Sequence, residues 1–419
     1  MSHYKPYPAY RESGVDWIGQ VPEHWKKMPF KRVASICNGH DYKEVENADG
    51  AYPVIGSGGE FARASDFMFD GKSVLLGRKG TIDKPLYING PFWAVDTMFY
   101  TKIADNAFPK FVYYNALTIP FGLYSTNTAL PSMAGEDLSS HLIVAPDFEE
   151  QKAIATCVDR ETTRIDALIT KKTRFIELLK EKRQALITHA VTKGLDPNVK
   201  MRDSGIDWIG EVPEQWNVVQ VRHVATLGSG HTPSRSRPDW WEDCYIPWFT
   251  LADIWQVRRE GRRFVTETEE KVSDLGVANS SAVVHPAGSV MLSRTASVGF
   301  PAIMGCDMAT SQDFAVWRCG SRVVNEYLYL VLLGMKQELS RLMIGSTHKT
   351  IYMPDIEAFR MPLPSEEQQK LIVQYVGDEL QRFDTLVAKT QRSIDLLRER
   401  RAAFITAAVT GQIDLRESA

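Results

Sequence analysis

The sequence contains few cysteines, and they lack the spacing that usually gives cysteine a function. Of 419 residues only five are cysteine, namely Cys37, Cys157, Cys244, Cys306 and Cys319. They form no Cys-x-x-Cys pair, and none stands at a metal-ligand spacing from a histidine. An odd and scattered set argues against a disulfide scaffold or a zinc finger, and favours buried or incidental thiols.

Long apolar runs are also missing. Stretches such as Tyr327–Met335 are much shorter than the roughly 18 residues that a membrane-spanning helix needs. The first residues, MSHYKPYPAY, contain no apolar core of a signal peptide. We therefore expect a cytoplasmic protein. The 44% apolar and 24% charged residues are ordinary for a globular chain, and the length suits two or three domains.

Neither charge sign dominates, and two catalytic motifs are lacking. The net charge of −3 gives no overall attraction to nucleic acid, although local basic faces can exist within a balanced total. The sequence has no Gly-x4-Gly-Lys-Ser/Thr phosphate loop. It also has no Asn/Asp-Pro-Pro-aromatic stretch of the kind that holds an extruded adenine. We expect this chain neither to bind ATP nor to methylate DNA by itself.

What the sequence does have is a short box written twice. Residues 11–25 read RESGVDWIGQVPEHW and residues 202–216 read RDSGIDWIGEVPEQW, with eleven of fifteen positions identical. Two tryptophans, an Ile-Gly turn and a Val-Pro-Glu step make each copy too rigid for a linker and too short for a domain. We interpret the box as a structural clamp between a module and a helix, with direct docking of a partner as the alternative. The clamp residues are Trp17, Trp25, Trp208 and Trp216.

A longer repeat follows each box at a distance. Residues 146–196 and 364–414 align without a gap at an offset of 218. Neither proline nor glycine interrupts Glu149–Lys193, and only Gly377 interrupts Glu366–Thr410. Each stretch is therefore predicted to be one long helix, the first of roughly 65 Å at about 1.5 Å per residue.

Apolar residues in these helices recur every seven positions, which is typical of a coiled coil. The seam consists of Val158, Ile165, Leu179, Leu186, Val376, Phe383, Leu397 and Phe404. A flanking row is expected at Leu168, Phe175 and Leu386. An ordinary core helix in each domain is the alternative, and the heptads leave parallel and antiparallel pairing open. The long connection between the helices favours an antiparallel pair with a module at each end and approximate two-fold symmetry.

The two modules between box and helix differ far more than the helices do. Both alternate short strand-like runs with turns and short helices, which indicates a mixed α/β fold. The expected strands are Ser73–Leu76, Phe92–Tyr100, Ser289–Leu292 and Phe314–Arg318, and the expected helices are Lys110–Ile119 and Asn325–Leu342. The two spacer helices are similar, whereas the two modules differ. This combination is typical of a protein that reads two different targets at a fixed separation, such as two DNA half-sites.

Polar loops recur at equivalent places in both modules and supply side chains that match base edges. LLGRKGTI at 75–82 parallels MLSRTASV at 291–298, and STNTAL at 125–130 parallels STHKTI at 346–351. The RREGRR cluster at 258–263 is a candidate for phosphate contacts. The candidate DNA-binding residues are Arg78, Lys79, Thr81, Asn127, Thr128, Arg235, Arg237, Arg258, Arg259, Arg294, Thr295, Ser297, His348 and Lys349. For each of these, a solvated loop residue is the simpler interpretation.

The chain resembles the specificity (S) subunit of type I restriction-modification systems. The resemblance rests on the doubled box SGVDWIGQVPEHW, on the proline, acidic residues and glutamine that begin each long helix, and on the duplicated layout. The resemblance covers essentially the whole chain. It implies two mixed α/β target recognition domains held apart by an antiparallel coiled coil, each domain reading half of a split, asymmetric site in double-stranded DNA. The implied domains are 1–25, 26–145, 146–200, 201–216, 217–362 and 363–419, in the order box, recognition domain, spacer helix, repeated once.

The same resemblance implies a noncatalytic chain. Two methyltransferase (M) subunits and ATP-driven restriction (R) subunits would assemble on it, and S-adenosylmethionine, ATP and Mg would be bound by those partners. The chain itself would hold no catalytic residue, no metal and no cofactor. Two other classes stay open from the residues alone: a fused restriction enzyme whose catalytic motif is unrecognised, and a scaffold that uses its modules to hold proteins.

Overall fold

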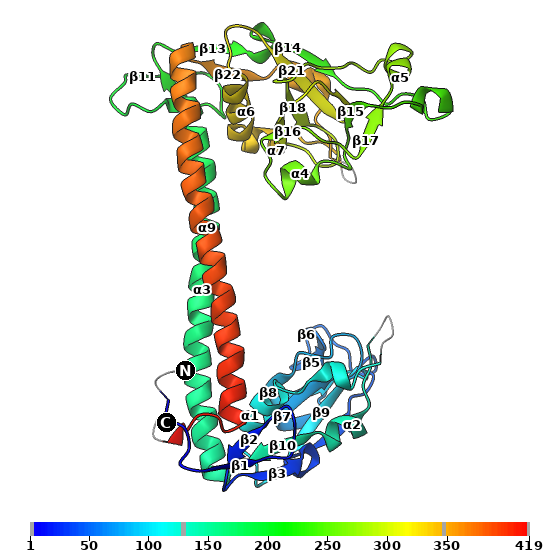
Figure 1. Cartoon of the computed structure of the whole chain (residues 1–419), viewed down its shortest axis with the longest axis vertical. Helices are drawn as coiled ribbons and strands as arrows, with labels where there is room; N and C mark the ends of the chain where they lie inside the picture. The colour runs from blue at the N-terminus through cyan, green and yellow to red at the C-terminus, as the bar shows by residue number, and fades with distance from the viewer. Residues whose placement is uncertain (1–3, 127–130, 346–348, 417–419) are drawn as a thin grey trace. The chain divides into compact units, whose positions relative to one another are not determined.

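The computed structural model describes residues 4–126, 131–345 and 349–416. The chain divides into two compact units, one formed by Met1–Thr173 with Gln391–Ala419 and the other by Arg174–Thr390. Both long helices, α3 (Phe148–Lys193) and α9 (Glu366–Val409), contribute one half to each unit (Figure 1). Because the division cuts through these helices, the six linear domain boundaries stay a prediction.

The first unit is built on a six-stranded sheet with the order β4-β9-β7-β8-β5-β6. The strands are β4 (Ala34–Asn38), β5 (Tyr52–Gly56), β6 (Gly59–Ala64), β7 (Phe69–Gly77), β8 (Leu86–Ala94) and β9 (Met98–Ile103). Side chains of β7 alternate between the two faces, as a strand requires. Val74 and Leu76 pack beneath helix α1 (Pro109–Ala116), whereas Leu75 joins a second apolar cluster with Phe92. Both faces of β7 are therefore buried.

The second unit keeps part of this frame. Its five-stranded sheet has the order β14-β21-β18-β19-β16, and the first three strands correspond to β4-β9-β7. A further sheet has the order β17-β15-β20. The strands are β14 (Ala225–Ser229), β15 (Ile246–Phe249), β16 (Phe264–Val265), β17 (Glu270–Val272), β18 (Val290–Ser293), β19 (Pro301–Met304), β20 (Ala309–Thr310) and β21 (Phe314–Cys319). The modules thus share a frame and differ in what surrounds it, as expected.

The second unit also contains short helices, of which α6 packs on this sheet. They are α4 (Trp255–Arg258), α5 (Asp274–Ala278), α6 (Asn325–Gly334), α7 (Lys336–Leu342) and α8 (Met353–Glu357). Helix α6 packs against β18 and β19 (Figure 1). It buries Leu328 and Val331 in the same cluster as Val290 and Leu292 of β18.

Two predicted elements are wrong in their extent. The run Phe92–Tyr100 is not one strand, because a turn separates β8 from β9. The stretch Asn325–Leu342 is two helices that break at Met335. At this break α3 binds the last carbonyls of α6: Gln184 Nε2 donates to Leu333 O at 2.9 Å, and Thr188 Oγ1 donates to Gly334 O at 3.2 Å.

A short antiparallel pair of strands joins the beginning and the end of each module. Strand β3 (Lys26–Pro29) pairs with β10 (Leu142–Ala145), and β13 (Asn217–Gln220) pairs with β22 (Arg360–Leu363). Each pair joins the first strand of a module to its last strand, directly before a long helix. In the first unit, helix α2 (Gly135–Ser140) immediately precedes β10.

Each box forms a small hairpin with the same backbone. Strand β1 (Tyr10–Glu12) pairs with β2 (Gln20–Pro22), and β11 (Met201–Asp203) pairs with β12 (Glu211–Pro213). Both hairpins need glycine in the left-handed region: φ is +66° and +70° in the first box, and +69° and +64° in the second. The repeated sequence of the box therefore gives the same hairpin turn in both copies.

Within each unit, the start of one long helix packs against the end of the other. Ile154 and Val158 of α3 share an apolar cluster with Phe404 and Ala408 of α9 in the first unit. In the second unit, the end of α3 at Ile187 and Val191 shares a cluster with the start of α9 at Ile372 and Val376. The predicted antiparallel pairing is confirmed in each unit. Among the described residues we find no helix with the length and apolar content that crossing a bilayer requires.

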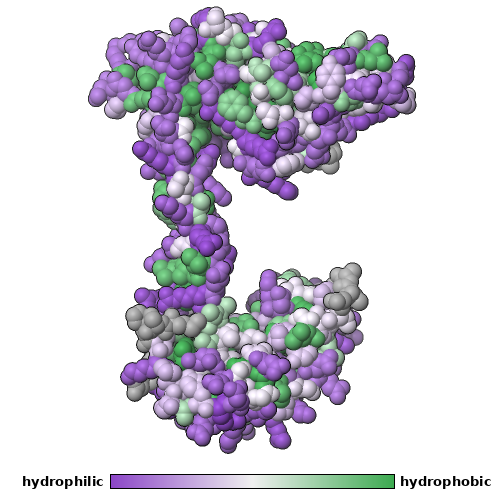
Figure 2. Space-filling model, in the orientation of Figure 1, coloured by the Kyte–Doolittle hydropathy of each residue, from purple (hydrophilic) through white to green (hydrophobic). Residues whose placement is uncertain are grey.

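The predicted seam is largely correct, but the flanking row is wrong. Six seam residues are buried, and Leu186 and Leu397 are half-buried. In contrast, Leu168, Phe175 and Leu386 are exposed, so these residues do not line the seam. Figure 2 shows the result, since apolar surface alternates with hydrophilic surface along the long helices. The buried neighbours of the seam are instead Ile176 and Ile394, which are equivalent in the repeat.

Candidate nucleic-acid interface

Two polar segments that sequence reasoning selected lie together at the end of strand β7. The loop that follows β7 begins at Arg78, whose carbonyl accepts a hydrogen bond from Met133 N at 3.0 Å. Gly80 N donates to Pro131 O at 3.0 Å. Lys79 and Thr81 are exposed in this loop. Asn127 and Thr128 lie outside the described residues.

The same arrangement recurs at the end of strand β18. Ile351 N donates to Arg294 O at 2.9 Å, and Ala296 N donates to Lys349 O, also at 2.9 Å. Lys349 is exposed, whereas Thr295 and Ser297 are half-buried. His348 lies outside the described residues. In both units the structure therefore joins two segments that are more than fifty residues apart in sequence, and we call each pair a reading loop.

The two reading loops share an unusual backbone conformation. Gly80 has φ of +81°, and Ala296 occupies the corresponding position with φ of +58°. Alanine rarely adopts this region, because its Cβ approaches the following carbonyl oxygen. Strained positions of this kind cluster at functional sites.

The equivalent arginines are held differently. Arg294 donates from Nε to Gln312 O at 3.1 Å and from Nη1 to Ile351 O at 3.3 Å. Arg78 makes one long contact, from Nη1 to Asp96 O at 3.4 Å, and lies 5.8 Å from the centre of the Phe99 ring. Arg294 therefore supports its own loop, while most of the donors of Arg78 have no partner among the described residues.

A basic turn lies beside the second reading loop. Arg258 of α4 is 5.9 Å from the centre of the Phe300 ring, and Phe300 N donates to Ser293 Oγ at the base of the loop. Arg258 and Arg259 are exposed, and neither forms an ion pair within the described chain. Their neighbours Arg262 and Arg263 are neutralised by Glu260 and Glu326. Only the first two arginines of RREGRR thus offer free charge for a phosphate.

Arg235 and Arg237 are placed differently from the other candidates. Arg235 stacks 3.7 Å from the centre of the Trp241 ring and forms an ion pair with Glu270. Arg237 bonds both carboxylate oxygens of Asp239, at 3.0 and 2.8 Å. Their partners lie on their own segment and on β17, not on the reading loop. The structure therefore gives both arginines local partners, which a DNA contact would have to replace.

Sequence reasoning missed Asn38, which lies next to the first reading loop. A pocket of about 510 Å³ is lined by Asn38, Arg78, Ser132 and Asp137, among others. Asn38 ends β4, is exposed, and makes no side-chain hydrogen bond with the described residues. An asparagine amide can bond the edge of adenine, and an arginine that of guanine. The available signal was position, because Asn38 directly precedes the Gly39-His40 pair that recurs as Gly230-His231.

The predicted clamp tryptophans differ in burial. Trp25 is fully buried, and its Nε1 donates to Glu150 Oε1 at 3.1 Å. Trp216 is also buried, in a cluster with Ile187 and Val191 of α3. Trp17 is 38% exposed and stacks on His141. The second tryptophan of each box thus contacts a long helix, while the clamp role itself stays a prediction.

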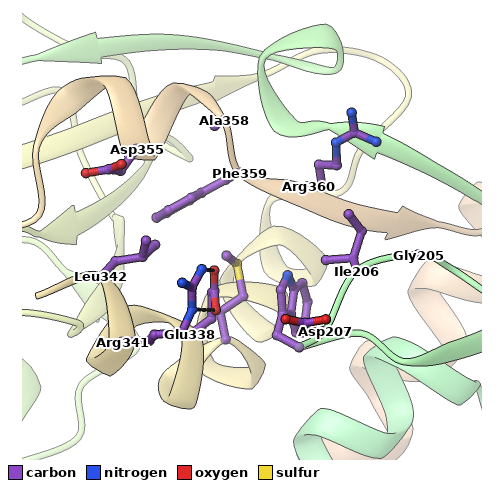
Figure 3. A pocket seen from close by; sticks show the side chains of 12 residues that line it. Gly205, Ile206, Asp207, Glu338, Arg341, Leu342, Asp355, Ala358, Phe359 and Arg360 are labelled. Atoms are coloured by element: carbon purple, nitrogen blue, oxygen red, sulfur yellow. Dashed lines mark hydrogen bonds and ion pairs between the residues drawn. The ribbon is translucent and has the colours of Figure 1, made fainter.

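Trp208 borders a pocket of about 420 Å³ beside the second box (Figure 3). Arg341 and Glu338 of α7 form a two-bond ion pair in it, at 2.7 and 2.8 Å. Asp207 and Phe359 also line the pocket. Arg341 and Glu338 are therefore occupied by each other, and neither was among the residues that the sequence selected.

Within the described chain, no group of three or more histidine, cysteine or acidic residues is placed to hold a metal ion. The five cysteines are free thiols. The polar groups that do converge are the amides, guanidinium groups and hydroxyls of the reading loops. These groups can recognise bases and phosphates.

Comparisons with known proteins concern the family and the fold. The family model described as "Type I restriction modification DNA specificity domain" matches residues 22–178 and 213–396. The specificity subunit of the type I restriction enzyme MjaVIII of Methanocaldococcus jannaschii is 21% identical, over 95% of both chains. That of MjaIX from the same organism is 26% identical, over 45% of this chain and 42% of its own length.

Solved structures show the same fold. A chain from work on complex assembly and conformational transition of the type I R-M system has a TM-score of 0.70 at 15% identity, covering 93% of this chain and 98% of its own. The HsdS subunit of Thermoanaerobacter tengcongensis has a TM-score of 0.53 at 17% identity, covering 94% and 98%. The two curated relatives are specificity subunits, the class that the doubled box and doubled helix resemble. The chain belongs to the type I restriction-modification DNA specificity family.

Proposed function

We propose that the two reading loops recognise the two halves of a split, asymmetric sequence in double-stranded DNA. The supporting observation is that one backbone arrangement occurs twice with different side chains. Arg78, Lys79 and Thr81 stand in the first loop where Arg294, Thr295 and Ser297 stand in the second. Since base edges are distinguished by the donors and acceptors that face them, two such loops read two different sequences.

Recognition in this proposal combines two kinds of contact. The reading loops and Asn38 supply direct contacts to bases. Arg258 and Arg259 supply phosphate contacts, which add affinity and salt dependence but carry no sequence information. Because these two arginines lie beside the second loop, they would fix the register of that loop on the duplex.

The chain then directs the chemistry of other subunits. We infer that two M subunits assemble on it and methylate adenine at the chosen site, and that R subunits join them for ATP-dependent cleavage. S-adenosylmethionine, ATP and Mg would be bound by these partners. The complex would act in the cytoplasm, where its DNA is accessible.

A salt titration of DNA binding by the chain with its M subunits tests this proposal. Arg258→Ala and Arg259→Ala should weaken binding to all sequences alike, and each should reduce the slope of log affinity against log salt by about one. Arg262→Ala is the matched control, since Glu260 already neutralises Arg262. Unchanged slopes for the first two variants, or equal affinity of the wild-type complex for every sequence, would contradict the proposal.

A further inference from the structure

A buried glutamine lies in the first turn of helix α3 and ties that helix to the recognition module. Gln151 is 3% exposed. Its side-chain carbonyl accepts a hydrogen bond from Phe108 N at 2.9 Å. Its Nε2 donates to Pro146 O at 3.0 Å and to Asn106 O at 3.4 Å. One amide thus bonds two separate segments of the chain.

The second unit repeats this arrangement at the start of α9. Gln369 is fully buried, and its carbonyl accepts from Val324 N at 2.8 Å. Its Nε2 donates to Pro364 O and to Arg322 O, both at 3.0 Å. We call Gln151 and Gln369 the helix-start glutamines. They are equivalent in the repeat, although the modules that they bond have diverged.

The chemistry of the site requires an amide. Phe108 and Val324 are the N-cap residues of α1 and α6, and neither helix has a side-chain cap. Each glutamine must accept from the N-cap N–H and donate to carbonyl oxygens at the same time. Glutamine does both, whereas a carboxylate of the same shape can only accept when ionised.

These bonds lead directly to the reading loops. Helix α1 packs on β7, and the first reading loop follows β7. Helix α6 packs on β18, and the second reading loop follows β18. Each glutamine therefore fixes the beginning of a short helix, α1 or α6. That helix packs on the strand, β7 or β18, from which the reading loop follows. In each unit this path connects a long helix to its reading loop.

We propose that Gln151 and Gln369 are positioning residues, each of which sets the orientation of one reading loop on its long helix and so the fidelity of one half-site. This inference rests on the proposed function. It assigns to each half-site a residue that touches no DNA. A role limited to stability would instead lower the free energy of unfolding without changing discrimination by the folded chain.

The test uses the chain in complex with its M subunits and the Gln369→Glu variant. Binding is measured at pH 8 to the methylated sequence found in cells and to duplexes with one mismatch in either half-site. Discrimination in the half-site of the second module should fall by about tenfold, as expected from the loss of one or two buried hydrogen bonds. Discrimination in the other half-site should change by less than about twofold, within the additivity of distant sites. Gln151→Glu should give the reverse pattern.

Two controls separate positioning from loss of folding. Gln368→Glu places the same charge on the adjacent, half-buried residue, whose side chain makes no hydrogen bond with the described chain, and it should leave both half-sites unchanged. Lowering the pH to about 5.5 should partly restore discrimination in Gln369→Glu, because a protonated carboxyl can donate like the amide. Thermal unfolding of the same variant at pH 8 shows whether it is folded, because protonation would also refold a variant that the buried charge had unfolded.

The possible outcomes are distinct. If the wild-type complex binds all duplexes equally, the proposed function fails. If the wild type discriminates and Gln369→Glu discriminates equally well in both halves, the positioning role is overturned. If Gln369→Glu loses discrimination in both halves to the same degree and does not recover at low pH, the glutamine is only structural, which also overturns the inference.

Discussion

Arg401 of helix α9 forms an ion pair with Asp166 of helix α3, with its Nε 2.9 Å from a carboxylate oxygen. The equivalent pair in the other unit is Arg183 with Asp384, at 2.5 Å. An offset of 218 converts one pair into the other. Each pair joins the first half of one helix to the second half of the other, so both pairs specify the same antiparallel register.

Reversing one charge should destabilise the first unit, and reversing both should restore it. Asp166→Arg places like charges together, and Asp166→Arg with Arg401→Asp recreates the attraction. Because both side chains are partly exposed, we expect a coupling of less than about 1 kcal/mol that weakens in high salt. A double-mutant cycle by chemical denaturation measures it. A double variant no more stable than Asp166→Arg would argue against this register.

The two tryptophans of the first box should differ in their contribution to stability. Trp25→Ala removes a fully buried ring and leaves Glu150 without one of its donors, so the free energy of unfolding should fall by about 3–5 kcal/mol. Trp17→Ala removes a partly exposed stacking contact and should cost about 1 kcal/mol. Denaturant unfolding of both variants gives the comparison. Equal losses would count against Trp25 as the residue that fastens the box.

The pH dependence of stability should include a contribution from His141. Burial lowers the pKa of His141 to about 4, and its Nε2 has no partner in the described chain. The unfolded histidine takes up a proton near its usual pKa of 6.5, while the folded one stays neutral. The contribution is therefore complete above pH 6.5 and is lost as the pH falls toward 4, by up to about 3 kcal/mol.

His141→Phe supplies the control for this pH effect, because phenylalanine stands at the equivalent position 359. The difference in unfolding free energy between wild type and variant should depend on pH between 6.5 and 4. Carboxylates and His285 affect both proteins alike and cancel in the difference. A difference that stays constant with pH would show that His141 is not buried in the neutral form.

The left-handed position in each reading loop gives a further prediction. Gly80→Ala forces a Cβ into the left-handed region and should lower the free energy of unfolding by about 1 kcal/mol. Ala296→Gly relieves that strain but increases the freedom of the unfolded chain, so stability should change by less than about 1 kcal/mol. Thermal unfolding tests both. A neutral Gly80→Ala together with a strongly destabilising Ala296→Gly would contradict the shared backbone.

Local sequence signals predicted the long helices well. The absence of proline and glycine from Glu149–Lys193 predicts the extent of α3, and the seven-residue spacing predicts burial of Val158, Val376 and Phe404. These signals depend on short-range geometry, in which one helical face needs one class of side chain. The similar sequences around Arg78 and Arg294 likewise predicted two equivalent loops, because both follow corresponding strands of the two sheets.

Tertiary contacts explain what the sequence could not predict. Leu168 and Phe175 fit the heptads but are exposed, because the buried face of the helix passes through Ile176 instead. The end of α6 is hydrogen-bonded by Gln184 of α3, which is distant in sequence. Asn38 precedes the recurring Gly39-His40 pair, but the pocket that it shares with Arg78 is visible only in the structure. Such residues gain their roles from distant partners, which periodicity does not show.

The central claim is that each module reads one half of a split DNA site. The most direct measurement maps methylated adenines in cells that carry either the wild-type chain or a chain in which residues 26–145 are replaced by the corresponding module of a relative. We predict that one half of the methylated sequence changes and that the other half stays the same. A site that changes in both halves, or that does not change at all, would contradict the claim.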